Sequence, residues 1–224
     1  MINSTRPRSL FAAPRILFLC ANLAAVATAS AGEVYATAGL PGFMLGYVHP
    51  LTDTVAVRAD VSTLRLNDSG QKEGVDYRGQ AKLDRAGVFA DWFAFARGGF
   101  RLTGGITFND MRANVTGRGR GQLVTVGANP YLLTAADRFD VQIRFPRTTP
   151  YIGMGWGHQP SLESGWGFVL DLGASIGKAK VTGDASGPVL SSPDAQQDFQ
   201  RELRERADKT AFIPQISVGL GYRF

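Results

Sequence analysis

The chain has 224 residues, of which 44% are hydrophobic, with 24 Lys and Arg, 19 Asp and Glu, and one cysteine. Three of the basic residues, Arg6, Arg8 and Arg15, lie in the first 31 positions, so the remainder carries an excess of only two positive charges. A nucleic-acid partner therefore has little support from composition. With Cys20 as the single cysteine, an internal disulfide is excluded.

Residues 1–31 predict a secretory signal peptide. Arginines without acidic residues precede an apolar run over 16–27, and the small residues of 27–31 provide a cleavage site, expected after Ala29 or Ala31. The run is shorter than the ~20 residues of a spanning helix, so a membrane anchor is not expected. Leu19 before Cys20 lacks the small side chain that lipoprotein processing needs. The working domain is then 32–224.

Apolar residues alternate with polar or small ones along this domain, which is the period of a β-strand. Eight strands are predicted, at 34–40, 43–49, 55–62, 87–93, 100–109, 139–157, 166–177 and 210–224. The sixth is interrupted between Pro146 and Pro150, and its apolar positions change there from odd to even. We therefore expect a β-bulge or break near Arg147.

The connections also alternate in length. After a tight turn at 40–42 they run short, long, short, long, short and long, at 50–54, 67–79, 96–99, 110–138, 158–164 and 183–209. Short turns at one end and long loops at the other are typical of transmembrane β-barrels, whose strands need only ~9–11 residues to cross. A sheet can cross a membrane only as a closed barrel.

Two of the long loops contain predicted structure. A small hairpin is expected at 125–133, around Asn129-Pro130. Ser192-Pro193-Asp194 has the composition of a helix start and precedes an amphipathic helix over 193–207. This helix would either cap the barrel rim or bind a partner or a membrane surface.

The orientation of the two strand faces separates a membrane barrel from a soluble, lipocalin-like one. In the last two strands the less apolar face is mostly Gly, Ser and Ala, which suits the crowded interior of a narrow barrel better than a water-exposed surface. Aromatic residues gather at strand ends, as at membrane interfaces. The predicted fold class is all-β: an eight-stranded antiparallel transmembrane β-barrel with a short helix in the last external loop.

On this fold, charged side chains point into the barrel lumen. They are Arg58, Asp60, Asp91, Arg101 and Asp171, with Arg144 as a further candidate. One interpretation is an ion-pair network that plugs the barrel, since an unpaired charge there would be costly. The other is a polar path for a small solute.

The last strand ends on Phe224, with Val218, Leu220 and Tyr222 at alternate positions before it. This ending resembles the closing strand of small Gram-negative outer-membrane β-barrels, typified by the OmpA transmembrane domain and OmpX. The resemblance implies a location in the cell outer membrane, among lipid and lipopolysaccharide, as a monomer. It also implies that these four residues are an assembly signal, read by the barrel-assembly machinery after transport by periplasmic chaperones.

Further candidate residues lie in the connections between strands. Arg112, Arg118 and Arg120 belong to a basic stretch that could contact lipopolysaccharide phosphates or only keep the loop soluble. The histidines are His49 and His158. A triad of His158 with Ser161 or Ser164 and Glu163 can be drawn, but on the periplasmic side, whereas lipid A-modifying barrels react near the outer rim.

No catalytic, cofactor or metal site is therefore predicted. The expected role is structural or surface-interacting, with a plugged lumen. The alternatives are a narrow channel for small or hydrophobic solutes and, third, a lipid A-modifying enzyme.

Overall fold

The computed structural model describes residues 32–224 apart from 73–74, 96–97, 128, 160–163 and 210. The predicted signal peptide and cleavage sites lie outside the described residues. Among the residues described, no helix is both long and apolar enough to cross a lipid bilayer.

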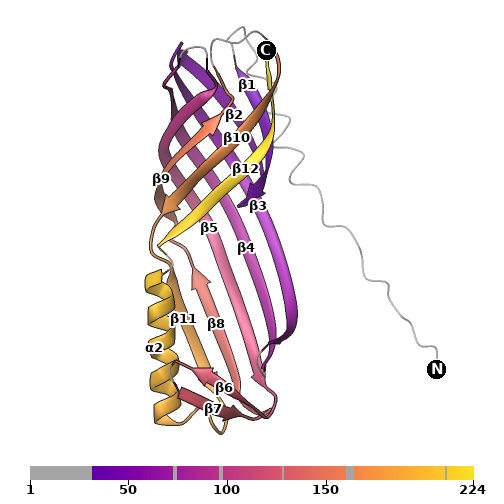
Figure 1. Cartoon of the computed structure of the whole chain (residues 1–224), viewed down its shortest axis with the longest axis vertical. Helices are drawn as coiled ribbons and strands as arrows, with labels where there is room; N and C mark the ends of the chain where they lie inside the picture. The colour runs from indigo at the N-terminus through magenta and orange to yellow at the C-terminus, as the bar shows by residue number, and fades with distance from the viewer. Residues whose placement is uncertain (1–31, 73–74, 96–97, 128, 160–163, 210) are drawn as a thin grey trace, which may run out of the picture. The chain divides into compact units, whose positions relative to one another are not determined.

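Eight antiparallel strands close into a ring (Figure 1). In ring order they are β1 (Glu33–Leu40), β2 (Gly42–Thr52), β3 (Val55–Lys72), β4 (Val75–Phe93), β5 (Phe100–Gly119), β9 (Thr148–Trp156), β10 (Gly165–Ile176) and β12 (Phe212–Arg223). Pairing of β12 with β1 closes the ring, with Tyr222 opposite Val34. The predicted eight-stranded barrel is confirmed.

The tight turn between β1 and β2 is also confirmed. Only Pro41 separates the two strands, and Gly42 has a φ of 124°, a backbone conformation that side-chain-bearing residues rarely adopt. The barrel wall is therefore low at this point, whereas β3, β4 and β5 continue well beyond it.

The predicted long loop at 67–79 is wrong, and much of the loop at 110–138 is strand as well. β3 and β4 stay paired up to Lys72 opposite Val75, and β5 continues to Gly119. The part of β5 that lies beyond the ring pairs with β8 (Arg138–Arg144), which pairs in turn with β11 (Lys180–Ser186). Strands β3, β4, β5, β8 and β11 thus form a sheet that continues beyond the ring, which we call the extension.

The predicted break near Arg147 has a structural basis in this arrangement. Residues 145–147 separate β8 from β9, and both strands pair with β5: β9 with Phe100 to Phe108, and β8 with Arg112 to Arg118. The predicted sixth strand is thus two strands, of which only β9 belongs to the ring.

Strands β3, β4 and β5 reverse their polarity at one level. In the ring part of these strands the outward side chains are apolar, and the last of them are Val61, Ala86 and Phe108. The next outward residues are Thr63, Asp84 and Asp110, which are direct partners across the three strands. The inward side chains change in the opposite sense, from Ser62, Arg85 and Asn109 to Leu64, Leu83 and Met111. The ring thus has an apolar outside, and the extension an apolar inside.

The apolar inside of the extension is covered in part by two further elements. The helix α2 (Pro193–Lys209) contains the predicted helix and buries Ala195, Phe199 and Leu203. It lies along β11 rather than on the barrel rim (Figure 1). The hairpin of β6 (Gln122–Val126) and β7 (Asn129–Leu133) is longer than predicted, and its turn precedes Asn129. Asn129 Nδ2 and the Tyr131 hydroxyl both donate to Asp198 Oδ2, at 2.7 Å each, which ties the hairpin to the helix.

Candidate functional site

The structure brings together the five charged residues assigned to the lumen by sequence, and adds a sixth. Arg58 is central: its Nε lies 2.9 Å from Asp91 Oδ2, its Nη1 lies 3.3 Å from Asp60 Oδ2, and its Nη2 lies 3.6 Å from Asp171 Oδ1. Arg101 contacts Asp171 and Asp91 from the other side. None of the five is more than 4% exposed.

Arg85 is the residue that the sequence prediction missed. Its Nη2 lies 3.2 Å from Asp60 Oδ1, and it is itself 4% exposed. It occupies the inward position two residues before Gly87, where the predicted strand began, so a longer reading of the same alternation would have included it. With Arg85 the network holds three arginines and three aspartates and is formally neutral.

Neutral side chains add hydrogen bonds to the network. The Tyr35 hydroxyl donates to Asp60 at 2.9 Å, and Thr103 Oγ1 donates to Asp91 at 2.6 Å. The Arg58 guanidinium also lies over the Phe89 ring, 4.5 Å from its centroid, a favourable cation–π geometry. At Gly155 a Cβ atom would come within 2.8 Å of the Arg101 guanidinium, so the absent side chain makes room for it.

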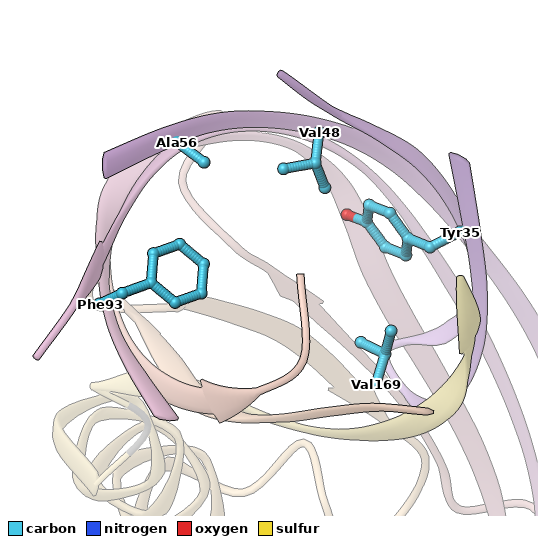
Figure 2. Close-up of a cluster of buried hydrophobic side chains, with 5 residues drawn as sticks. All are labelled: Tyr35, Val48, Ala56, Phe93 and Val169. Carbon is cyan, nitrogen blue, oxygen red and sulfur yellow. The ribbon is translucent and has the colours of Figure 1, made fainter. Parts of the chain in front are cut away.

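The lumen is filled on both sides of this network. Towards the end of the ring where β1 begins and β12 ends, Figure 2 shows Tyr35, Val48, Ala56, Phe93 and Val169 pointing into the ring from different strands, each no more than 2% exposed. Towards the extension, Thr107, Thr149, Ser175 and Asn109 form a buried hydrogen-bonded cluster. An eight-stranded barrel has an interior about wide enough for side chains alone, and here they occupy it.

Arg144 does not face the lumen, so that expectation is wrong. It is exposed on the outward side of β8, opposite Arg112 and Lys180. The reason is the same break that divides the predicted sixth strand: β8 pairs with the extension part of β5 and never enters the ring.

His158 lies in the turn after β9 and is 3% exposed. Its Nδ1 lies 2.5 Å from Glu33 Oε1, and Arg223 Nη2 lies 2.7 Å from Glu33 Oε2. Of its drawn triad partners, Ser161 and Glu163 lie outside the described residues, and Ser164 is exposed. The observed partner of His158 is thus an acid on β1, at the end of the barrel where the two termini of the ring meet. His49 is near that end too, with its ring 6.5 Å from that of Tyr47.

The four residues of the predicted assembly signal form an outward apolar strip. Val218, Leu220, Tyr222 and Phe224 are each between 40% and 58% exposed. Leu220 and Tyr222 lie opposite Phe168 and Trp166 of β10, and the rings of Tyr222 and Trp166 are 5.2 Å apart. Exposed aromatics on other strands at the same end include Trp92 and Trp156. The apolar outside of the ring therefore ends in a girdle of aromatic side chains.

The outward side of the extension carries the charges that replace this apolar surface. Asp84 accepts from Thr63 at 2.8 Å and lies 3.0 Å from Lys82 Nζ, which also contacts Asp110. The hydrogen bond from Lys82, with that from Arg112, holds the pKa of the Asp110 carboxyl below its ordinary value. We call this surface, from Thr63, Asp84 and Asp110 outward, the charged band.

Arg112, Arg118 and Arg120 lie on or beside the charged band, but in different surroundings. Arg112 Nη2 lies 2.9 Å from Asp110 and lines a groove of about 940 Å³. That groove spans the level of the polarity change, because its lining includes Phe108 and Phe145 as well as Arg144 and Arg147. Arg118 lines a second groove further out, with Arg78, Arg138 and three aspartates. Arg120 Nη1 lies 3.5 Å from Asp76.

The fold has counterparts among solved structures, although no known family and no curated protein matches the chain. CarO of Acinetobacter baumannii superposes with a TM-score of 0.68 at 18% identity, covering 86% of this chain and 97% of that one. CarO2 of the same organism gives 0.70 at 17% identity, covering 87% and 99%. A closed ring of eight antiparallel strands with an apolar exterior, an aromatic girdle and these counterparts is the fold of a small outer-membrane β-barrel protein.

Proposed function

We propose that this protein is a structural or surface-interacting component of the outer membrane, not an enzyme and not an open channel. The neutral network of three arginines and three aspartates carries this proposal, because it fills the lumen with paired and buried charge. Separating one charge of such a network from its partners is costly. The network therefore favours a single state in which the lumen is closed. The chain would reach the membrane through export by its signal peptide and insertion by the barrel-assembly machinery, and would act there as a monomer.

Conductance in planar lipid bilayers tests the closed lumen. The purified protein, reconstituted beside a 16-stranded porin as positive control, should give no resolvable single-channel openings while the porin does. Discrete and reproducible openings of the wild-type barrel would contradict the proposal and favour the solute channel.

The surface interaction that we propose is with lipopolysaccharide phosphate, at the groove lined by Arg112, Arg144 and Arg147. Its lining places guanidinium groups beside the apolar exterior of the ring, as an amphiphile with a phosphorylated head and acyl chains requires. Among the described residues, Arg144 and Arg147 make no ion pair. Arg112 is shared with Asp110, and Arg120 with Asp76, so these two offer less free charge.

Binding of isolated lipopolysaccharide to the reconstituted protein tests this contact. Changing both Arg144 and Arg147 to Ser should weaken binding at least tenfold at low salt, and changing Arg118 and Arg120 to Ser should weaken it less. A control with the same loss of charge is Arg201→Ser with Arg204→Ser, on the exposed side of α2. Wild-type binding by the Arg144 and Arg147 variant would rule the groove out. An equal decrease in this variant and in the control would indicate only a general charge effect and would also count against the groove.

A further inference from the structure

The extension contains an apolar groove between its sheet, α2 and the β6–β7 hairpin. Its volume is about 470 Å³, and eleven of its fourteen lining residues are apolar. They come from the sheet (Val115, Val141), the hairpin (Val124) and the helix (Phe199, Leu203), so the groove is bounded by three separate elements. This enclosure admits a small molecule more readily than a helix or strand of another protein.

The groove is not simply the core of the extension. Protein cores are packed with few voids larger than a water molecule, whereas this space is about three times the roughly 150 Å³ of an engineered apolar cavity that stays dry and binds benzene. Val141 and Ile143 beside the groove remain half-buried, although the helix lies across from them.

The chemistry of the lining indicates an uncharged ligand. Glu202 is the single charged residue among the fourteen that line the groove, and Thr125 supplies a hydroxyl. None of the fourteen lining residues is basic, so the groove offers no ionic partner to an anion such as a fatty acid. A volume of this size also lies within the ~300–1,000 Å³ usual for small-ligand pockets.

We infer that this groove binds a small, uncharged, hydrocarbon-rich molecule at the end of the barrel that the extension forms. The charged band surrounds the same strands on their outward side, so the groove lies beyond the apolar exterior of the ring and takes its ligand from outside the lipid. Because side chains fill the lumen of the adjoining ring, the groove would hold the ligand and not pass it through the barrel. The inference is independent of the lipopolysaccharide contact, which uses the opposite face of the sheet.

Photolabelling of the signal-free chain in phosphatidylcholine nanodiscs tests the site, with a diazirine derivative of dodecane as probe. Peptides containing 138–144 and 193–203 should be labelled saturably, and unlabelled dodecane should compete. The peptide 212–223, on the lipid-facing exterior, should show only non-saturable labelling. Val141→Phe fills the groove and should reduce labelling of the first two peptides at least tenfold. The matched control Val88→Phe, on the outside of the ring, should leave it unchanged.

Three results would overturn the inference. They are labelling of 138–144 and 193–203 that does not saturate, labelling that Val141→Phe leaves intact, and equal or stronger saturable labelling by the diazirine derivative of dodecanoic acid. If Val141→Phe does not show the heat-modifiable gel migration of a folded barrel, Val124→Phe replaces it. This variant also fills the groove, from the hairpin, which lies outside the ring. Labelling of wild type that persists in Val124→Phe would count against the groove in the same way.

Discussion

Removal of Asp91 tests the lumen network most directly. Asp91 is fully buried and receives hydrogen bonds from Arg58 Nε at 2.9 Å and Thr103 Oγ1 at 2.6 Å, with Arg101 Nε at 3.6 Å. Asp91→Ala leaves three arginines with two aspartates, so one buried positive charge loses its partner. Breaking a buried pair in this way costs about 3–5 kcal/mol, and we expect a destabilisation of that size.

Urea unfolding in lipid vesicles, followed by the gel migration of the unboiled protein, measures this cost. The control is Asp110→Ala, which removes an ion-paired aspartate from the charged band; its side chain is 54% exposed, and exposed ion pairs contribute little to stability. The double variant Asp91→Leu with Arg101→Met restores neutrality and should cost less than the sum of its two single changes. If Asp91→Ala and Asp110→Ala shifted the unfolding midpoint equally, the buried network would contribute no more to the stability of the barrel than an exposed ion pair.

Three further predictions concern other parts of the molecule. Deleting Phe224 should abolish heat-modifiable migration in membranes, whereas Phe43→Ser, an equally outward change on β2, should retain it; assembly of both would show that Phe224 is no assembly signal. Phe199→Ala should destabilise the packing of α2 by about 3 kcal/mol and speed proteolysis within 193–209 while the barrel stays folded; unchanged proteolysis would mean that α2 is held by other contacts. Hydrogen bonds from Asn129 and Tyr131 lower the pKa of Asp198, so the stability they confer is present above the ordinary Asp pKa of about 3.9 and is lost as pH falls through the lowered value. Hydrogen exchange of α2 should therefore rise in acid in wild type and much less in Asp198→Asn; the same acid response in both would exclude this carboxylate as its source.

The ring could be predicted from the sequence because its strands obey one local rule. In Val55 to Ser62 and in Trp166 to Ile176, an apolar residue stands at every second position, and over most of each segment burial in the structure follows the same alternation. The helix was predictable for a similar reason, since Ser192-Pro193-Asp194 begins it and Ala195, Phe199 and Leu203 follow at a spacing of four. Local periodicity is sufficient to predict a strand or helix when each of its faces keeps the same surroundings along the whole element.

The extension was not predictable because its strands meet two environments in succession. Leu64, Leu66 and Leu83 are apolar at inward positions, where the ring has polar residues, so the alternation appeared to end and Asn67-Asp68-Ser69-Gly70 resembled a turn. The pairing of β8 with β5 and β11 joins segments far apart in the chain, and no local pattern identifies such partners. The sequence predicted a lumen of paired charges but missed Arg85. This residue occupies the last inward position of β4 before the polarity changes.

The change of polarity at Thr63, Asp84 and Asp110 also determines how tall the lipid-facing surface is. β5 has 20 residues, more than the ~9–11 that a crossing needs, and only its part up to Phe108 has an apolar outside. The phase of the alternation, and not the length of the strand, sets this height. One residue inserted after Asn109 would turn Met111, Ala113 and Val115 outward and Arg112 inward, since a slip of one position exchanges the two faces of a strand. The outward apolar surface of β5 would then be longer, and the extension would lose the apolar side chains that β5 contributes to its inward face.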